Sequence, residues 1–225
     1  MFNKNKSLQI IFFVLFGCII MSIIEGVVQP VYIYKSLFKI ITFLSLILIY
    51  SFINKDFSYF KIFKITSKKD FFTSILMGLI VYLVIISAYF IAKNFINLNE
   101  ISANLMSKEN ISKDNFIFVA IYISLINSLL EEMFFRGFAF ITLKNFISLK
   151  FAYIFSALSF SLYHIFIMAS WFSPLLFILL LSSLIIAGLI FNYFDRRSVL
   201  YNSWLIHMSA NLAINTVGLI MFNII

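Results

Sequence analysis

The segment LLEEMFFRG, residues 129–137, places two acids and an arginine in the middle of an otherwise apolar run that extends from Phe116 to Leu143. At the centre of a bilayer each such charge costs about 2.5–3.5 kcal/mol on insertion scales, so buried charges are usually paired or functional. The segment therefore predicts one of two things inside a membrane. It is either an ion-pair cluster that only fixes helix packing, or part of a polar site.

Helical spacing separates the roles of these charged residues. Glu132 and Arg136 lie four residues apart with the acid first, which is the favourable order for an ion pair on one helix face. Glu131 points about 100° away from Glu132, because an α-helix has ~3.6 residues per turn. We therefore expect Arg136 to neutralise Glu132 while Glu131 faces a polar cavity. Asn127, one turn earlier, would extend that polar face.

Composition places the chain in a membrane. Of its 225 residues, 63% are hydrophobic and only 12% are charged, and the mean hydropathy is +1.05. No soluble domain of this size needs so apolar a sequence, and the short alternating segments of a β-barrel are absent. We predict an all-α, multi-pass bundle of about seven transmembrane helices, with six to eight possible. The single cysteine, Cys18, excludes an intramolecular disulfide and a Cys-based metal site.

Seven apolar stretches are long enough to cross a bilayer. They cover about residues 8–24, 31–53 or 36–53, 71–92, 116–143, 151–168, 175–194 and 200–222. The lysine-rich segment 54–70 is expected to lie on the membrane surface or to form a solvated loop that sets the topology. The polar segment 93–115 is expected to form an external loop with a short helix, and residues 171–174 should form a turn at the interface.

The formal charge of +8 indicates topology rather than nucleic-acid binding. With the N-terminus inside, most lysines and arginines fall in inner segments, whereas Lys35 and Lys39 count among the few in outer ones. The heavy use of Ile, Phe, Lys and Asn indicates an AT-rich bacterial genome. We therefore predict a multi-pass protein of a bacterial cell membrane, with a cytoplasmic N-terminus, an external C-terminus and no nucleic-acid partner.

The two histidines of the chain, His164 and His207, both fall inside predicted spans. Each belongs to a stripe of residues at four-residue steps, a spacing that stacks side chains on one helix face. In the seventh span the stripe consists of Ser203, His207, Asn211 and Asn215. A lone buried histidine is more often a packing residue. Two histidines, a carboxylate and an aligned asparagine on three helices instead indicate one functional cavity.

Two chemistries suit a carboxylate, two imidazoles and an amide. In the first, Glu131 and a histidine activate water, while a second histidine and Asn211 donate hydrogen bonds to the oxyanion. In the second, Glu131, His164 and His207 hold a catalytic zinc ion with one position open for water. Spacing leaves both open. The motifs H-E-x-x-H, G-x-S-x-G and G-x-G-D are absent, which counts against three other ways of cutting peptides in membranes.

Three motifs, taken in order, resemble those of the CPBP intramembrane proteases, the Abi group that includes the type II CAAX prenyl endopeptidases. They are E-E-x-x-x-R at 131–136, F-x-x-x-H at 160–164 and H-x-x-x-N at 207–211. We accordingly divide the chain into residues 1–115, which hold N-terminal helices and loops without a motif, and residues 116–225, a protease-like core.

The resemblance implies roles for the motif residues. Glu131 and His164 would activate water, and His207 and Asn211 would form the oxyanion site. Supporting roles fall to the other motif residues, Glu132, Arg136 and Phe160. The family is often described as metalloproteases, although a metal-free glutamate mechanism has also been argued for it. A zinc ion therefore stays open as the cofactor.

We predict an intramembrane endopeptidase that cleaves a peptide or a membrane-associated protein. The resemblance implies bacteriocin self-immunity or peptide maturation as the context, since bacterial relatives are linked to such roles, whereas CAAX processing needs prenylated proteins that a bacterium does not ordinarily supply. One alternative is a non-catalytic immunity protein that binds a peptide, and it would still protect after substitution of the motif residues. Another is a small proton-coupled transporter that uses buried Glu and His, and it would show pH-driven flux.

Overall fold

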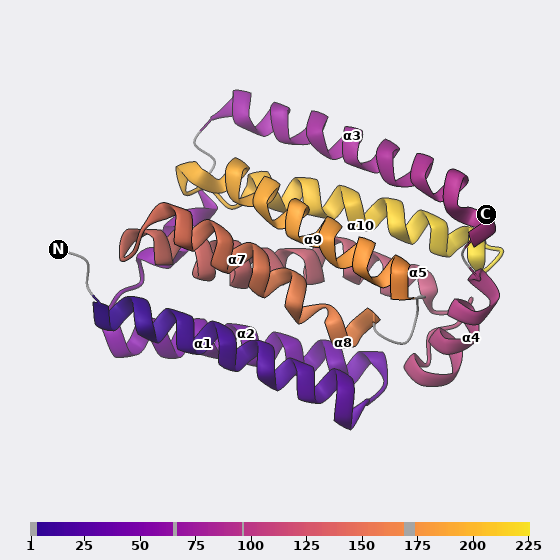
Figure 1. Ribbon diagram of the computed structural model, residues 1–225, viewed down its shortest axis with the longest axis horizontal. Coiled ribbons are helices and arrows are strands. Elements are labelled where there is room, and N and C mark those ends of the chain that lie inside the picture. The colour runs from indigo at the N-terminus through magenta and orange to yellow at the C-terminus, as the bar shows by residue number, and fades with distance from the viewer. Residues whose placement is uncertain (1–3, 65–66, 96, 169–173) are drawn as a thin grey trace.

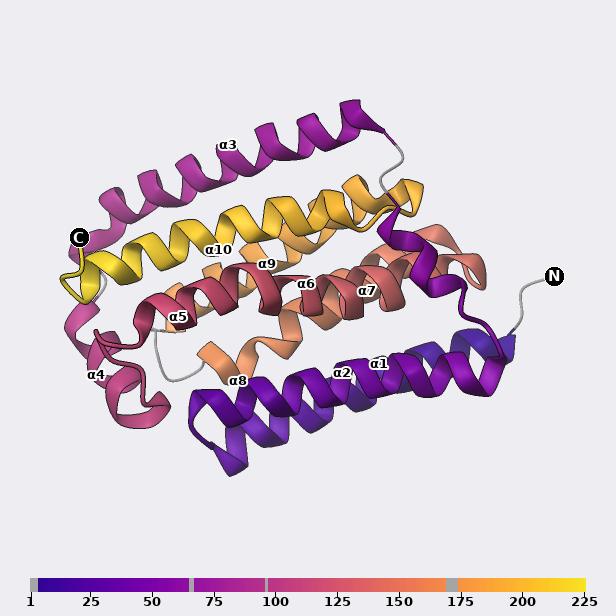
Figure 2. The same ribbon diagram turned by 180° about the vertical axis from the view of Figure 1, so that it is seen from behind.

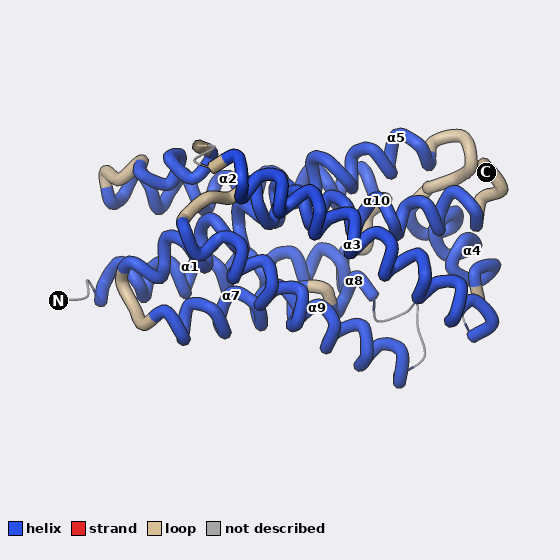
Figure 3. The backbone as a smooth tube through the Cα atoms, turned by 90° about the horizontal axis from the view of Figure 1, so that it is seen from above, coloured by secondary structure: helices blue, strands red, loops and turns tan. Residues whose placement is uncertain are grey.

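The computed structural model describes residues 4–64, 67–95, 97–168 and 174–225. These residues form helices and connecting turns, with no strand among them (Figure 3). Seven helices in the described ranges are long and apolar enough to cross a membrane. The all-α, multi-pass bundle predicted from composition is therefore confirmed.

The helices follow the predicted spans within a few residues. The long ones are α1 (Lys4–Ile23), α2 (Tyr32–Asn54), α3 (Lys68–Ala92), α7 (Leu149–Tyr163), α9 (Pro174–Phe194) and α10 (Tyr201–Met221). The short ones are η1 (Ile24–Val28), η2 (Ser58–Phe63), η3 (Lys93–Phe95), α4 (Leu98–Glu109), α8 (Ile165–Met168) and η7 (Asp195–Arg197). The turn predicted at 171–174 lies outside the described residues, except for Pro174, which begins α9.

The fourth span lies at the centre of the bundle. It contacts α1 and α2 on one side, and α7 and α10 on the others. In Figure 1 the pair α1 and α2 forms one edge of the molecule, and α3 lies along α10 at the opposite edge. The view from behind in Figure 2 shows α4 at one end of the bundle, near the C-terminus. We call this the α4 end.

An aromatic core holds the fourth span in place. Phe134, Phe135 and Phe138 are fully buried. Phe43 of α2 stacks on Phe134, with ring centroids 4.0 Å apart. Gly17 of α1 permits this packing, because a Cβ there would lie 2.7 Å from the Phe134 ring. The helix that carries the first motif is thus positioned by the part of the chain that has no motif.

The fourth span differs from the regular α-helix that the sequence predicts. It consists of α5 (Phe116–Ile121), η4 (Tyr122–Asn127), α6 (Ser128–Glu131), η5 (Glu132–Thr142) and η6 (Leu143–Asn145), of which η4 and η5 are π-helical. Helices with i→i+5 hydrogen bonds are rare and often occur at functional sites. Glu131 is the last residue before the longer π-helical stretch.

Side chains from neighbouring elements donate to carbonyls of these wide turns. Tyr59 donates to the Met133 carbonyl at 2.7 Å, and Ser156 of α7 to the Phe135 carbonyl at 2.8 Å. Burial raises the pKa of Tyr59 well above its ordinary value, so its hydroxyl remains a donor. Because such donors come from distant parts of the chain, the irregular turns could not be read from local sequence.

Two residues of the polar stripe of α10 also donate hydrogen bonds to carbonyls of the fourth span. Asn211 donates to the Ile123 carbonyl at 3.2 Å, and Asn215 donates to the Ala120 carbonyl at 3.1 Å. Side-chain hydrogen bonds of this kind hold transmembrane helices together. The stripe therefore binds α10 to the fourth span, as well as carrying one of the histidines.

One prediction for the N-terminal half is wrong. Lys35 and Lys39 do not lie in an outer segment, because both are inside α2 with only 8% and 9% exposure. The segment 54–70, expected on the membrane surface, packs in part against the bundle. Its short helix η2 buries Tyr59 and Ile62 against Gly137 of the fourth span, where a side chain at residue 137 would clash with them.

Candidate active site

Glu131 lies in the interior of the bundle and is 2% exposed. Its Oε1 atom accepts hydrogen bonds from Lys39 Nζ and Asn127 Nδ2, both at 3.1 Å. Its Oε2 atom faces the Nε2 atoms of His164 and His207, at 3.9 and 3.8 Å. The structure thus brings together the carboxylate and both histidines that the sequence assigned to one cavity. Asn127 extends the polar face as expected.

Each of the two imidazole rings is held by a hydrogen bond at Nδ1, the nitrogen that faces away from Glu131. His164 Nδ1 bonds to the Phe160 carbonyl at 2.7 Å, and His207 Nδ1 bonds to Glu132 Oε1 at 2.7 Å. A carbonyl and a carboxylate can only accept, so we assign a proton to Nδ1 in both rings. Each ring therefore presents Nε2 to Glu131. The predicted helix over 151–168 breaks at His164, which lies in the turn between α7 and α8.

Glu132 and Arg136 form the predicted ion pair, with Nε and Oε2 3.3 Å apart and both side chains fully buried. The guanidinium carbon of Arg136 lies 4.0 Å from the centroid of the Phe160 ring and 4.7 Å from that of Phe191. Phe191 also stacks on His207, with centroids 5.4 Å apart. The pair and its aromatic surroundings therefore lie directly behind the His207 ring.

Lys39 is a site residue that the sequence analysis missed. Its Nζ donates to Asn127 Oδ1 at 2.8 Å and to Glu131 Oε1 at 3.1 Å, and lies 5.3 Å from the centroid of the Tyr163 ring. The available signal was the cost of a lysine inside an apolar run, the same argument that singled out Glu131. Assigning Lys35 and Lys39 to an outer loop hid that signal.

Asn211 lies apart from this cluster in the hydrogen-bond network. Its amide binds the Ile123 carbonyl, and no hydrogen bond joins it to Glu131 or to either histidine in the described part of the chain. Ser203, on the same stripe, is also engaged elsewhere. Its hydroxyl and backbone nitrogen both donate to the buried carboxylate of Asp195, at 2.6 and 3.0 Å.

The residues do not fit a zinc centre well. Ligand atoms around a tetrahedral zinc ion lie about 3.3–3.4 Å apart, given bonds of about 2.0–2.1 Å, whereas Glu131 Oε2 lies 3.8 and 3.9 Å from the two Nε2 atoms. The Lys39 ammonium, bonded to the same carboxylate, would repel a divalent cation. Across the described residues, no group of three or more His, Cys, Asp or Glu side chains is arranged to hold a metal ion. We therefore derive no step through a metal.

Comparison with known proteins finds a family match. Residues 113–213 match the family model described as Type II CAAX prenyl endopeptidase Rce1-like. This segment contains all three motifs but not Lys39. No curated protein and no solved structure matches the chain. The match confirms the resemblance that the motifs indicate and supports, at family level, a CAAX-type intramembrane protease. Residues 113–213 of this multi-pass membrane protein are therefore similar to the Rce1-like, type II CAAX prenyl endopeptidases.

Proposed function

We propose that this protein is an intramembrane endopeptidase in which Glu131 activates a water molecule against a peptide bond. The observation that carries this proposal is that the two oxygens of the Glu131 carboxylate have different surroundings. Oε1 is bound by Lys39 and Asn127, whereas Oε2 has no hydrogen-bond partner within the described residues and faces two Nε2 atoms. Separations of 3.8–3.9 Å exceed a direct hydrogen bond of about 2.7–3.2 Å and suit a water that touches all three groups.

The reaction follows from this geometry. Glu131 Oε2 takes a proton from water as the water oxygen bonds to the carbonyl carbon, and the carbonyl electron pair moves onto the oxygen. His164 Nε2 orients the same water. The protonated Glu131 then gives its proton to the amine nitrogen as the C–N bond breaks. This sequence balances without an additional reactant.

The oxyanion needs hydrogen-bond donors near Glu131. We assign this role to His207 in its protonated form, because Glu132 fixes the ring with Nε2 toward the reacting groups. Asn211, one turn further along α10, keeps a second amide proton that can serve the same oxygen. A carboxylate that orients a catalytic histidine in this way is a recurring arrangement in hydrolases.

Lys39 has two effects on Glu131. Its ammonium offsets the buried negative charge, which would otherwise be costly in the bilayer interior. It also ties down Oε1, so that rotation of the carboxyl group cannot take Oε2 away from the imidazoles. We regard Lys39 as a positioning residue. The substrate is a peptide or membrane-associated protein, with self-immunity or peptide maturation as the proposed context.

The test is a cleavage assay on the purified full-length protein in detergent, with a pool of internally quenched apolar peptides. Wild type should cleave members of the pool, and Glu131→Gln should be slower by about 10²–10⁴-fold, the usual contribution of a general base. Normal turnover by Glu131→Gln would refute the assignment. A chelator should leave turnover unchanged, and loss of activity restored by zinc would show a metal centre instead. Protection against a toxic peptide that survives Glu131→Gln would indicate a non-catalytic immunity protein.

A further inference from the structure

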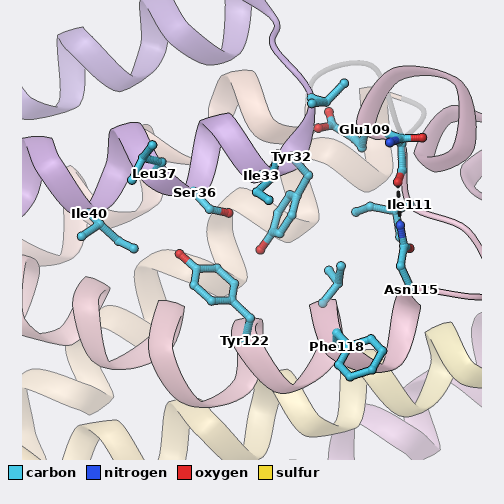
Figure 4. A pocket seen from close by; sticks show the side chains of 13 residues that line it. Tyr32, Ile33, Ser36, Leu37, Ile40, Glu109, Ile111, Asn115, Phe118 and Tyr122 are labelled. Atoms are coloured by element: carbon cyan, nitrogen blue, oxygen red, sulfur yellow. Dashed lines mark hydrogen bonds between the residues drawn. The ribbon is translucent and has the colours of Figure 1, made fainter.

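A groove opens between α2 and the beginning of the fourth span, at the α4 end of the bundle (Figure 4). Its volume is about 480 Å³, within the range of small-ligand sites. Most of its wall is apolar, formed by Ile33, Leu37 and Ile40 of α2 and by Phe118 of α5. Glu109, at the end of α4, lies at its outer end. Nothing in the proposed reaction uses this groove.

Three hydroxyl groups converge inside it. Figure 4 shows the hydroxyls of Tyr32 and Tyr122 pointing toward one another, with that of Ser36 between them. The Tyr122 oxygen is buried and has no hydrogen-bond partner among the residues the structure describes. A buried hydroxyl without a partner is unfavourable. An acyl or isoprenoid chain could not satisfy it, whereas a peptide backbone offers both donors and acceptors.

The outer end of the groove is negatively charged. Lys35 Nζ pairs with Glu109 Oε1 at 2.6 Å and with Glu25 Oε2 at 3.0 Å, so one ammonium faces two carboxylates. The second oxygen of Glu109, Oε2, is buried without a hydrogen-bond partner in the described ranges. This end therefore complements a cationic group such as a lysine or arginine side chain.

The inner end adjoins the reacting groups. Ile40 directly follows Lys39, and Tyr122 lies on the fourth span about one turn before Asn127. Lys39 and Asn127 are the two residues that bind Glu131 Oε1. A chain lying in the groove would thus lead toward Glu131.

The length of the groove sets the size of its occupant. The α2 residues along it run from Tyr32 to Ile40, which is about 12 Å at ~1.5 Å per residue. An extended peptide advances about 3.3 Å per residue, so about four residues fit this distance. We propose that the groove binds about four residues of an extended, apolar peptide, with a cationic side chain next to Glu109. This specificity rests on the proposed function, since the peptide bond beyond these residues is the one delivered to Glu131.

The experiment measures binding in the Glu131→Gln protein, full-length and in detergent, so that cleavage plays no part. Two fluorescent probes are compared by anisotropy, Lys-Leu-Phe-Leu-Ile amide and its counterpart Asp-Leu-Phe-Leu-Ile amide, each acetylated at the N-terminus and labelled at the C-terminus. We expect the lysine probe to bind about tenfold more tightly. Glu109→Gln should abolish this preference, and Tyr122→Phe should weaken both probes several-fold.

Matched controls lie close by. Tyr34 is an exposed tyrosine of α2 and Glu100 an exposed glutamate of α4, and neither lines the groove. Tyr34→Phe and Glu100→Gln should leave both affinities unchanged. If Glu109→Gln unfolds the protein because Lys35 loses a partner, Tyr122→Phe still tests the groove, since the Tyr122 hydroxyl has no hydrogen-bond partner among the described residues. Ile40→Trp, which fills the groove, should abolish binding of both probes.

Two results would overturn the proposal. One is unchanged probe binding in Tyr122→Phe and Ile40→Trp. The other is displacement of the lysine probe by myristate but not by unlabelled peptide, which would identify a lipid site. Either result could accompany normal cleavage by the wild type, and then only the groove assignment fails. Peptide binding that follows these expectations in a protein without peptidase activity would remove the proposed function but keep the groove.

Discussion

Glu131 and Glu132 are neighbours in the chain, yet their surroundings differ. Glu132 has His207 on one oxygen and Arg136 beside the other, and it is fully buried. Within the described residues Glu131 has hydrogen-bond partners on Oε1 only, and its Oε2 faces two imidazoles at distances too long for direct hydrogen bonds. We call the side of the fourth span around Glu132 the supporting face and the side around Glu131 the reacting face. Glu132 Oε2 also has no hydrogen-bond partner among the described residues, so the comparison shows that Glu131 is distinguished by an oxygen that faces two imidazoles instead of a guanidinium.

The largest expected difference between the faces is in turnover. Glu131→Gln should reduce it by about 10²–10⁴-fold, as expected for loss of a general base. The folded yield should fall less than for substitutions on the supporting face, because a glutamine oxygen still accepts from Lys39 and Asn127. Turnover of the quenched peptide pool and yield by size-exclusion chromatography measure the two effects. Equal loss of yield and turnover would make Glu131 a structural residue.

Substitutions on the supporting face should mainly lower the free energy of unfolding. Arg136→Leu leaves Glu132 as an uncompensated buried charge, and breaking such a pair costs about 3–5 kcal/mol. The double variant Glu132→Gln/Arg136→Leu should recover part of this loss, because residue 132 no longer carries an uncompensated charge. Denaturant unfolding in detergent measures both. Wild-type stability of Arg136→Leu together with lost turnover per folded molecule would instead place Arg136 at the reacting centre.

Two lysines of α2 allow a comparison in which the expected effect is smaller but the two residues are better matched. Lys35 and Lys39 are four residues apart, both are buried, and both pair with glutamate, but only Lys39 pairs with Glu131. Hydrogen bonds to charged groups contribute about 1.5–3 kcal/mol, so Lys39→Met should lower turnover by about ten- to a hundredfold. Lys39→Arg should recover part of that loss.

Lys35→Met is the control for Lys39→Met. It should lower the unfolding midpoint while turnover per folded molecule on a neutral peptide stays at the wild-type level. Equal turnover losses in the two methionine variants would show that α2 is only a scaffold, and that Lys39 has no particular effect on Glu131.

The sequence predicted the spans well because the length of an apolar run and its flanking charges are local signals. It also predicted the Glu132–Arg136 pair, since four-residue spacing sets that contact within one helix. Lys39 was missed because its partner lies on another helix, and nothing local connects α2 to Glu131. The π-helical turns were missed for a similar reason, because donors such as Tyr59 come from segments distant in the sequence.

The smallest effect concerns Asn211, which the motif places with His207 but whose amide binds the fourth span. Asn211 and Asn215 each donate to a carbonyl there, at 3.2 and 3.1 Å. Replacing either by alanine should therefore cost about 0.5–1.5 kcal/mol of unfolding free energy, the usual net value of one hydrogen bond. Only Asn211→Ala should also slow turnover, if its second amide proton reaches the oxyanion. Identical behaviour of the two variants in the peptide assay would show that Asn211 only holds α10 to the fourth span. His207 would then bind the oxyanion without help from Asn211.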